Sequence, residues 1–174
     1  MIENKTEAME ATNARLIEKV LGYLPGEGDF HTAVDGLTLY RREEVNKAEN
    51  CFYQPIIALT LQGQKRSIIG SEEYRYGAGH CLINGVDMPS LSYVTEAGPE
   101  KPFIVVTLDI DSQLTNRLIR EVPRPKSRKQ SAKGMAVSAT DPHVLNAFLR
   151  LLELHEKPAQ IPVLAPMIRR EIHY

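Results

Sequence analysis

Long apolar runs and cysteine are both scarce in this sequence of 174 residues. No apolar run approaches the roughly 18 residues that indicate a membrane-spanning helix, so no membrane partner is expected. Two cysteines give no disulfide framework, and reduced thiols are usual in the cytoplasm. The first ten residues, MIENKTEAME, are polar and lack the apolar core of a signal peptide. Together these absences predict a soluble cytoplasmic protein.

The sequence also lacks the patterns of a metal site and of a phosphate-binding loop. A cupin metal centre needs two histidines one residue apart, a glutamate a few residues later and a further histidine. No two of the five histidines are close in sequence, and His80 and Cys81, neighbours on a predicted strand, point to opposite faces. The segment GQKRSIIG lacks the glycine order of a phosphate loop, so Lys65 and Arg66 are interpreted as hairpin charges. We expect no metal and no cofactor.

The sequence does contain clear changes of periodicity along the chain. Apolar residues recur at spacings of three and four over residues 6–24, which predicts a helix. Residues 34–110 contain short runs rich in β-branched and aromatic residues, with turn residues about every 8–12 positions, as in a sandwich or barrel. The helical pattern returns at 112–121, again after the helix start at Asp141, and in a last helix from Pro162.

Charge is distributed unevenly between the two parts of the chain. Residues 1–116 carry a net charge of −7 and residues 117–174 a net charge of +6. Residues 117–133 hold seven basic side chains and one acidic one. Residues 122–134 are interrupted by proline and have no periodicity, which predicts a basic loop. The basic C-terminal third is either a solvated face or lies near an anionic partner, and the loop is its most basic stretch. The loop has no aromatic residue for base stacking, and no helix-turn-helix is recognisable.

Several side chains are candidates for a ligand site. The polar residues Gln62, Asn84, Asp87 and Tyr93 either line a pocket or serve turns, in which aspartate and asparagine are ordinary residues. Cys81 lies in the apolar stretch HCLI, and it is either buried packing or, like Cys51, a thiol that faces a cavity and meets a small electrophile. The residue types alone leave these alternatives open.

The stretch from Tyr53 to Asp111 resembles the N-terminal effector domain of AraC-type transcription regulators. One subgroup has Tyr-x-Pro, Gly-x-Lys-Arg, Tyr-x-Tyr-x-x-Gly-His, Asp-x-Pro and a late Pro-Phe or Pro-Tyr strand, in this order. The matching residues here are Tyr53, Pro55, Gly63, Lys65, Arg66, Tyr74, Tyr76, Gly79, His80, Asp87, Pro89, Pro102 and Phe103. The resemblance extends over about residues 30–174, and the order of the motifs together is specific.

The resemblance implies a mainly β fold with α-helices. The expected fold is a cupin-like β-barrel (jelly roll) without the metal ligands, preceded by one helix and followed by C-terminal helices, with His80 in a structural role. We predict an N-terminal helical segment at 1–30, the barrel at 31–112, and C-terminal helices with the basic loop at 113–174. The chain stops inside a helical pattern, so we expect a longer parent whose DNA-binding helix-turn-helix region is absent here.

The resemblance also implies a function, namely effector sensing and dimerisation within a DNA-binding transcription regulator, and not an enzyme activity. The expected partners are an unidentified small-molecule effector, a second copy of the chain, and DNA only through the absent region. The candidate ligand-binding residues are Tyr53, Gln62, Cys81, Asp87 and Tyr93. Two alternatives stay open: a cupin-type enzyme with a degenerate metal site, and an interaction domain without a ligand. A polar-lined cavity of roughly 300–1,000 Å³ would favour sensing, and a filled interior would favour a structural role.

Overall fold

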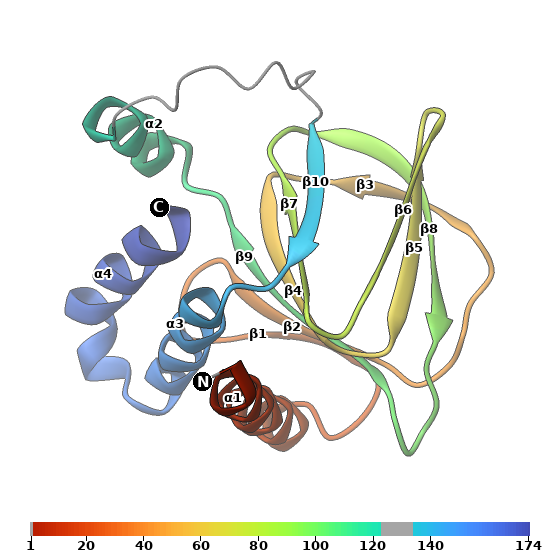
Figure 1. Cartoon of the computed structure of the whole chain (residues 1–174), viewed down its shortest axis with the longest axis horizontal. Helices are drawn as coiled ribbons and strands as arrows, with labels where there is room; N and C mark the ends of the chain where they lie inside the picture. Colours follow the sequence, from red (N-terminus) through yellow and green to blue (C-terminus); the bar gives the residue numbers. More distant parts are fainter. Residues whose placement is uncertain (1, 123–133) are drawn as a thin grey trace.

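The computed structural model describes residues 2–122 and 134–174. Along the chain a helix is followed by a run of strands and then by further helices with one more strand among them (Figure 1). The strands are β1 (Gly28–His31), β2 (Leu37–Arg42), β3 (Glu49–Tyr53), β4 (Ile56–Gln62), β5 (Gln64–Ile69), β6 (Glu72–Gly77), β7 (His80–Asn84), β8 (Met88–Glu96), β9 (Phe103–Asp109) and β10 (Met135–Ala139). The helices are α1 (Ile2–Tyr23), α2 (Ser112–Glu121), α3 (Pro142–Glu153) and α4 (Ile161–His173), with the short 3₁₀ turns η1 (Leu154–Glu156) and η2 (Pro158–Gln160) between α3 and α4.

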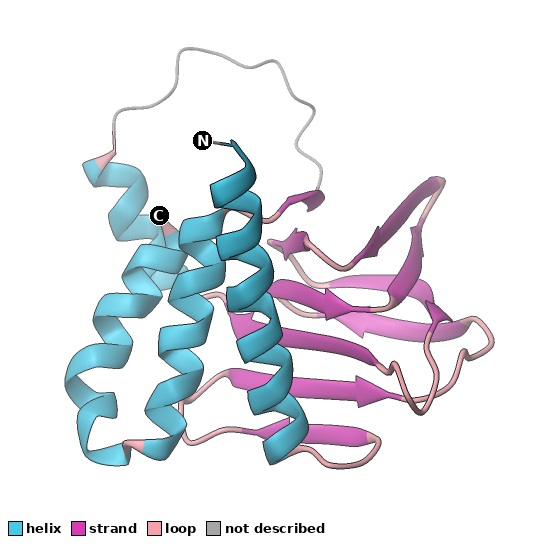
Figure 2. Cartoon of the chain, turned by 60° about the horizontal axis from the view of Figure 1, so that its bottom comes forward, coloured by secondary structure: helices cyan, strands magenta, loops and turns pink. Residues whose placement is uncertain are grey.

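The strands pair into two antiparallel sheets that face each other as a flattened barrel (Figure 1). One sheet has the order β1-β2-β9-β4-β7-β10, and we call it the helix-covered sheet. The other has the order β3-β8-β5-β6, and we call it the outer sheet. The helices lie together on one side of the barrel, against the helix-covered sheet (Figure 2). The predicted mainly β fold, with one helix before it and helices after it, is confirmed.

The principal hydrophobic core lies between the helices and the helix-covered sheet. Strand residues alternate between the two faces of a sheet, so every second residue of β2, β4 and β9 contributes to this layer. The fully buried side chains include Leu16, Val20, Leu39, Leu59, Ile104, Val106, Leu108, Phe148, Leu151 and Leu152. A second, much smaller core lies between the two sheets and contains Ala58, Tyr76, Leu82 and Met135. The barrel interior is therefore not the part of the molecule that holds most of the buried apolar side chains.

Two helices after the barrel begin where their sequences predict. The Asp111 side chain accepts a hydrogen bond from Leu114 N at 2.9 Å and caps α2. The Asp141 side chain accepts from His143 N at 2.8 Å and caps α3, whose first residue is Pro142. Both caps satisfy backbone N–H groups that have no partner within the helix. The broad apolar stripe of α3 then packs into the principal core.

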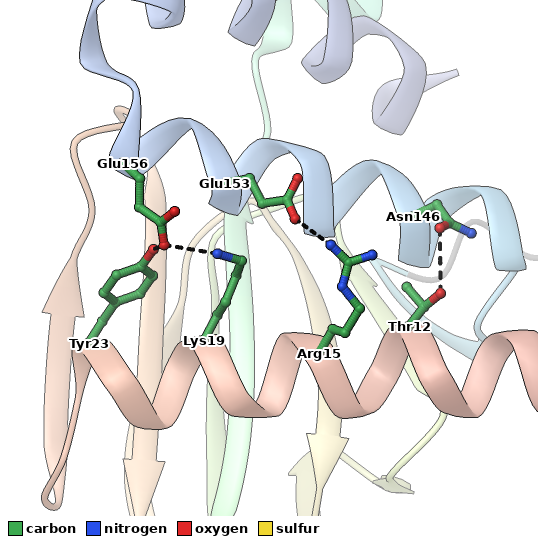
Figure 3. Close-up of polar contacts among 7 residues, drawn as sticks. All are labelled: Thr12, Arg15, Lys19, Tyr23, Asn146, Glu153 and Glu156. Atoms are coloured by element: carbon green, nitrogen blue, oxygen red, sulfur yellow. Dashed lines mark hydrogen bonds and ion pairs between the residues drawn. The ribbon is translucent and has the colours of Figure 1, made fainter.

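Polar side chains on one face of α1 fasten this helix to α3 and η1 (Figure 3). Arg15 pairs with Glu153 at 2.8 Å, and Lys19 pairs with Glu156 at 2.8 Å. Tyr23 donates its hydroxyl to the same Glu156 carboxylate. These contacts lie at the solvent edge of the interface, whereas Leu16 and Val20 fill its centre. The N-terminal helix is thus part of the same packed unit as the helices that follow the barrel.

The structure also contains three strands that the sequence pattern did not predict, namely β1, β3 and β10. β3 pairs with β8 in the outer sheet. β1 pairs with β2 at one edge of the helix-covered sheet, and β10 pairs with β7 at the other. β1 begins inside the predicted helical segment 1–30, and β10 lies inside the predicted helical segment 113–174, so the proposed division into three parts stays a prediction. Residues 123–133 of the predicted basic loop lie outside the described residues. None of the described helices combines the length and the apolar character that a membrane-spanning helix requires.

Candidate functional site

A cavity of about 520 Å³ lies between the two sheets and is lined by both. The helix-covered sheet supplies a largely apolar wall, formed by Ile56, Ala58, Leu82, Phe103 and Val105. The neighbours of these residues along each strand point the other way, into the principal core. About half of the apolar side chains of β4 and β9 thus pack against the helices, and only the other half point into the barrel. The barrel interior is therefore left partly open, which the sequence alone does not reveal.

The outer sheet supplies a cluster of hydroxyl groups on the opposite side of the cavity. The Tyr53 hydroxyl lies 2.9 Å from Ser67 Oγ, 2.9 Å from the Tyr76 hydroxyl and 3.3 Å from Ser92 Oγ. Ser67 also contacts Tyr76 at 3.0 Å, and Ser92 contacts Ser67 at 2.9 Å and Ser90 at 3.1 Å. These five hydroxyl groups have one proton each to donate and six contacts among themselves. Internal hydrogen bonds can therefore use all of their donors.

Lys65 brings a positive charge to this side of the cavity. Its position on β5 is directly across from Tyr76 on β6 and Val94 on β8, so all three side chains share the inner face. The ammonium nitrogen Nζ lies 5.5 Å from the centroid of the Tyr53 ring. Burial on its own would raise the pKa of Tyr53, but the Lys65 charge and the neighbouring hydroxyl groups outweigh it and lower that pKa from its ordinary value. Burial raises the pKa of Tyr76.

The exposed lining residues mark the rim of the cavity and include both signs of charge. Glu49 and Asp109 are exposed carboxylates at this rim. Arg42 also borders the cavity, but its guanidinium donates to Asp29 Oδ1 at 2.6 Å and to the Gly28 carbonyl at 2.8 Å. The charge of Arg42 is thus already neutralised by the Asp29 carboxylate on β1, whereas Glu49 and Asp109 are open to solvent.

The structure brings two of the predicted ligand-binding residues to this cavity. Tyr53 lines it through its ring. Tyr93 borders it, but strand alternation places its ring on the face of β8 opposite Ser92. There the Tyr93 hydroxyl accepts a hydrogen bond from Arg66 Nη1 at 2.7 Å. The Tyr93 side chain could therefore contact a ligand only on the outer face of β8, and not inside the cavity.

The other three predicted residues lie away from the cavity. Gln62 donates from Nε2 to the Pro102 carbonyl at 2.8 Å and borders a separate open depression. Asp87 is exposed in the turn between β7 and β8. Cys81 belongs to the principal core on the helix side of β7, where burial raises its pKa to about 11. The role of each as a ligand-binding residue stays a prediction, and none of the three shares a pocket with Tyr53.

The structure also identifies lining residues that the sequence analysis did not select. Lys65 was interpreted as a hairpin charge, and Ser92 and Tyr76 were not candidates. The signal that could have found Lys65 was its alternation with Arg66, which sends one base inward and the other outward to Glu73 and Tyr93. Of the two cysteines, Cys51 is the one that lines the cavity. Within residues 2–122 and 134–174, no three His, Cys, Asp or Glu side chains are grouped so that they could hold a metal ion.

Several solved structures are similar to this chain at low sequence identity. An unliganded ToxT variant from Vibrio cholerae has a TM-score of 0.49 at 10% identity, over 72% of this chain and 52% of that one. The AraC-like transcriptional activator CuxR has a TM-score of 0.49 at 11% identity, over 83% of this chain and 52% of that one. Wild-type ToxT from V. cholerae with a bound unsaturated fatty acid has a TM-score of 0.44 at 12% identity, over 76% of this chain and 51% of that one. This chain therefore matches about half the length of these proteins.

A family assignment comes from the sequence itself. No protein with a curated functional description matches the chain significantly. The sequence model described as the AraC-type transcriptional regulator N-terminus matches residues 33–174, which include every strand after β1 and the helices α2 to α4. The match spans most of the chain and agrees with the motifs between Tyr53 and Asp111. The chain therefore belongs to the family of N-terminal domains of AraC-type transcriptional regulators.

Proposed function

We propose that this domain senses a small-molecule effector, and that the cavity between the two sheets is the effector site. The observation that carries the proposal is the open interior of about 520 Å³, in which an apolar wall faces a cluster of hydroxyl groups. This volume falls within the range of roughly 300–1,000 Å³ that is usual for small-molecule sites. The cavity also has the usual composition of such a site, an apolar wall with a few convergent polar groups.

The alternative of a ligand-free interaction domain predicts a different interior. A purely structural barrel would fill its centre with large apolar side chains at the density of other protein cores. Here the large apolar side chains gather between the sheet and the helices instead. The packing that stabilises the domain is therefore separate from the cavity, and the interior is free to hold a ligand.

The alternative of a cupin-type enzyme would need a catalytic hydroxyl group that a neighbouring base activates. A hydroxyl nucleophile needs a base within hydrogen-bond reach. In the described part of the chain, the cavity hydroxyls bond to one another and not to a histidine or a carboxylate. The family is one of transcription regulators, and we infer a binding role without catalysis.

A cavity-filling variant tests the sensing proposal. Val105 is half-buried and lines the cavity, and Val105→Phe would occupy part of the open volume. Val137→Phe is the matched control, because Val137 packs on the same small core without lining the cavity. A thermal-shift panel of neutral, anionic and cationic small molecules should contain compounds that raise the melting temperature by about 5–10 °C at about 100 times their Kd. The shift should survive in Val137→Phe and vanish in Val105→Phe. A panel without any such compound would contradict the proposal.

We also infer that the domain forms a homodimer through α4. Val163 and Met167 are 66% and 65% exposed on this helix, although both are large and apolar. Exposed apolar side chains at one helical face are typical of association surfaces. Sedimentation analysis should find a dimer at about 100 µM chain that Met167→Glu dissociates. Val45→Glu, at an apolar site that is 59% exposed outside the helices, is the control and should remain dimeric. A monomeric wild-type chain would contradict this inference.

We infer the cellular location and the DNA binding of the parent protein from its family. A transcription regulator must reach DNA, so we place the protein in the cytoplasm, with DNA binding supplied by a part of the parent outside these 174 residues. The effector would then act on DNA binding through the helices that follow the barrel. Reporter expression from a cell carrying the intact regulator should lose its response to the effector in the Val105→Phe variant.

A further inference from the structure

One cation inside the cavity has no carboxylate partner. Lys65 lies between Tyr76 and Val94 on the inner face of the outer sheet, and these neighbours are only 6% and 5% exposed. No carboxylate of residues 2–122 or 134–174 lies within 4.0 Å of the Lys65 ammonium group. The contact recorded for Nζ is with the face of the Tyr53 ring. The ammonium group is thus held in the cavity without a counter-charge.

The Tyr53 ring only partly compensates this charge. A cation over an aromatic face is attracted by the ring quadrupole, but its positive charge remains. A charged group inside a protein is far more favourable with an ion of opposite sign and hydrogen bonds. The hydroxyl groups nearby can satisfy one another, so they do not need Lys65 and do not neutralise it.

From this arrangement we propose that the cavity takes an amphipathic organic anion, whose single carboxylate binds Lys65 and whose apolar part lies on the Val105 wall. The inference rests on the proposed sensing function and names the class of effector. The carboxylate would replace bulk water as the partner of Nζ. The apolar part would contact Leu82, Ala58 and Val105 on the facing sheet, and none of these three side chains carries a charge.

The other charges around the cavity favour one anionic group over two. Arg42 is already bound by Asp29, so it does not offer a second site for a carboxylate or a phosphate. Glu49 and Asp109 at the rim would repel additional negative charge. A ligand with one carboxylate inside and a neutral remainder therefore fits the charges better than a dicarboxylate or a phosphate ester does.

The test uses pairs of probes that differ in charge and little in shape. Benzoate and hexanoate are titrated calorimetrically into the 174-residue chain, with benzamide and hexanamide as neutral counterparts. At least one carboxylate should bind about tenfold or more tightly than its amide, as expected for a hydrogen bond to a charged group. Lys65→Met should remove this preference, and Lys65→Arg should retain part of it. Lys101→Met, which changes a lysine that is 68% exposed outside the cavity, should leave it unchanged.

The outcomes separate this inference from the proposed function. Equal binding of carboxylates and amides, or an unchanged preference in a folded Lys65→Met variant, would overturn the anion inference. Binding of neither carboxylate would overturn it as well. If a neutral or cationic compound still stabilises the chain and Val105→Phe abolishes that effect, effector sensing stands while the anion inference fails. If no compound of any charge binds the cavity, both fail.

Discussion

His173, near the end of α4, accepts a hydrogen bond on Nε2 from the backbone N–H of Asp111 at 3.0 Å. Its other ring nitrogen, Nδ1, lies 2.7 Å from the carbonyl oxygen of Arg169 and donates to it. These partners require the neutral imidazole with its proton on Nδ1, because a protonated Nε2 would face another donor. The last helix is thus tied to the junction between β9 and α2 by a contact that depends on the protonation of one histidine.

This contact predicts a loss of stability at mildly acidic pH. Burial lowers the pKa of His173 from its ordinary value of 6.5, and it outweighs the hydrogen bond to the Arg169 carbonyl, which raises that pKa. The Arg169 charge lowers the pKa further, and the Asp111 charge raises it. A lowered pKa means that the unfolded chain binds a proton first, so the contribution is complete above pH 6.5 and declines as the pH falls below it. Urea unfolding from pH 8 to pH 5 should therefore show a steeper loss for the wild type than for His173→Gln. The exposed His143 offers a control, since His143→Gln should keep the wild-type slope. Parallel slopes for all three chains would contradict the assignment.

Two glycines in neighbouring turns, Gly63 between β4 and β5 and Gly70 between β5 and β6, should differ in how much an alanine substitution destabilises the chain. Gly63 has a φ of +77°, and a Cβ placed there would lie 2.5 Å from the Glu96 carbonyl oxygen. Gly70 has a φ of +58° and nothing within 4 Å of the same position. Gly70→Ala should cost about 1–2 kcal/mol, the usual penalty for a left-handed residue. Gly63→Ala should cost clearly more, because the Cβ also collides with backbone. Equal urea midpoints for the two variants would show that the turn adjusts freely.

The attachment of α1 predicts a contrast between the centre and the edge of its interface. Leu16→Ala should lower the free energy of unfolding by about 2–5 kcal/mol, because Leu16 is fully buried in the principal core. Arg15→Ala should lower it by less than about 1 kcal/mol, because Arg15 is 62% exposed in its ion pair with Glu153. The comparison is made by urea denaturation at one pH. A large effect of Arg15→Ala would mean that the ion pair, and not the apolar packing, holds the helix.

The isolated chain should not distinguish DNA sequences. Reading a sequence needs side chains presented to base edges, usually from a helix in the major groove. The densest cluster of basic residues, Arg124, Lys126, Arg128, Lys129 and Lys133, is predicted to lie in a loop instead. Competition binding at about 150 mM salt should give weak affinity that is similar for all duplexes and falls steeply with added salt. A preference of about 1,000-fold for one duplex would contradict the view that this chain is the sensor part.

Much of the fold was predictable because the periodicity changes sharply along the sequence. The helix at 112–121 was predicted with the bounds of α2 because its apolar spacing is regular, and the structure adds Asp111 as its N-cap. β1, β3 and β10 were missed because four or five residues with a mixed pattern carry little signal by themselves. Their pairing with β2, β8 and β7 depends on tertiary structure that short sequence windows do not contain.

The site was less predictable than the fold. The alternation of side chains along a strand does not say which face of the strand packs against the helices and which faces the cavity. Cys81 and Leu82 are adjacent and both buried, yet Cys81 faces the helices and Leu82 faces the cavity. A helix-covered sheet and a barrel interior both favour apolar residues, so the sequence did not separate them. Tyr53 was found through a family motif, whereas Lys65 needed the register of β5 against β6 and β8.

The location of a bound ligand is the most direct test of the central claim that the cavity between the sheets is the effector site. The compound with the largest thermal shift would be bound to methyl-labelled protein, and intermolecular nuclear Overhauser effects would be recorded. Val105 and Leu82 line the cavity, whereas Val106 and Leu59 lie in the principal core. We predict contacts from the ligand to the methyl groups of Val105 and Leu82 and none to those of Val106 and Leu59. Overhauser effects from the ligand to methyl groups on other surfaces only, and none to Val105 or Leu82, would contradict the assignment of the cavity as the effector site.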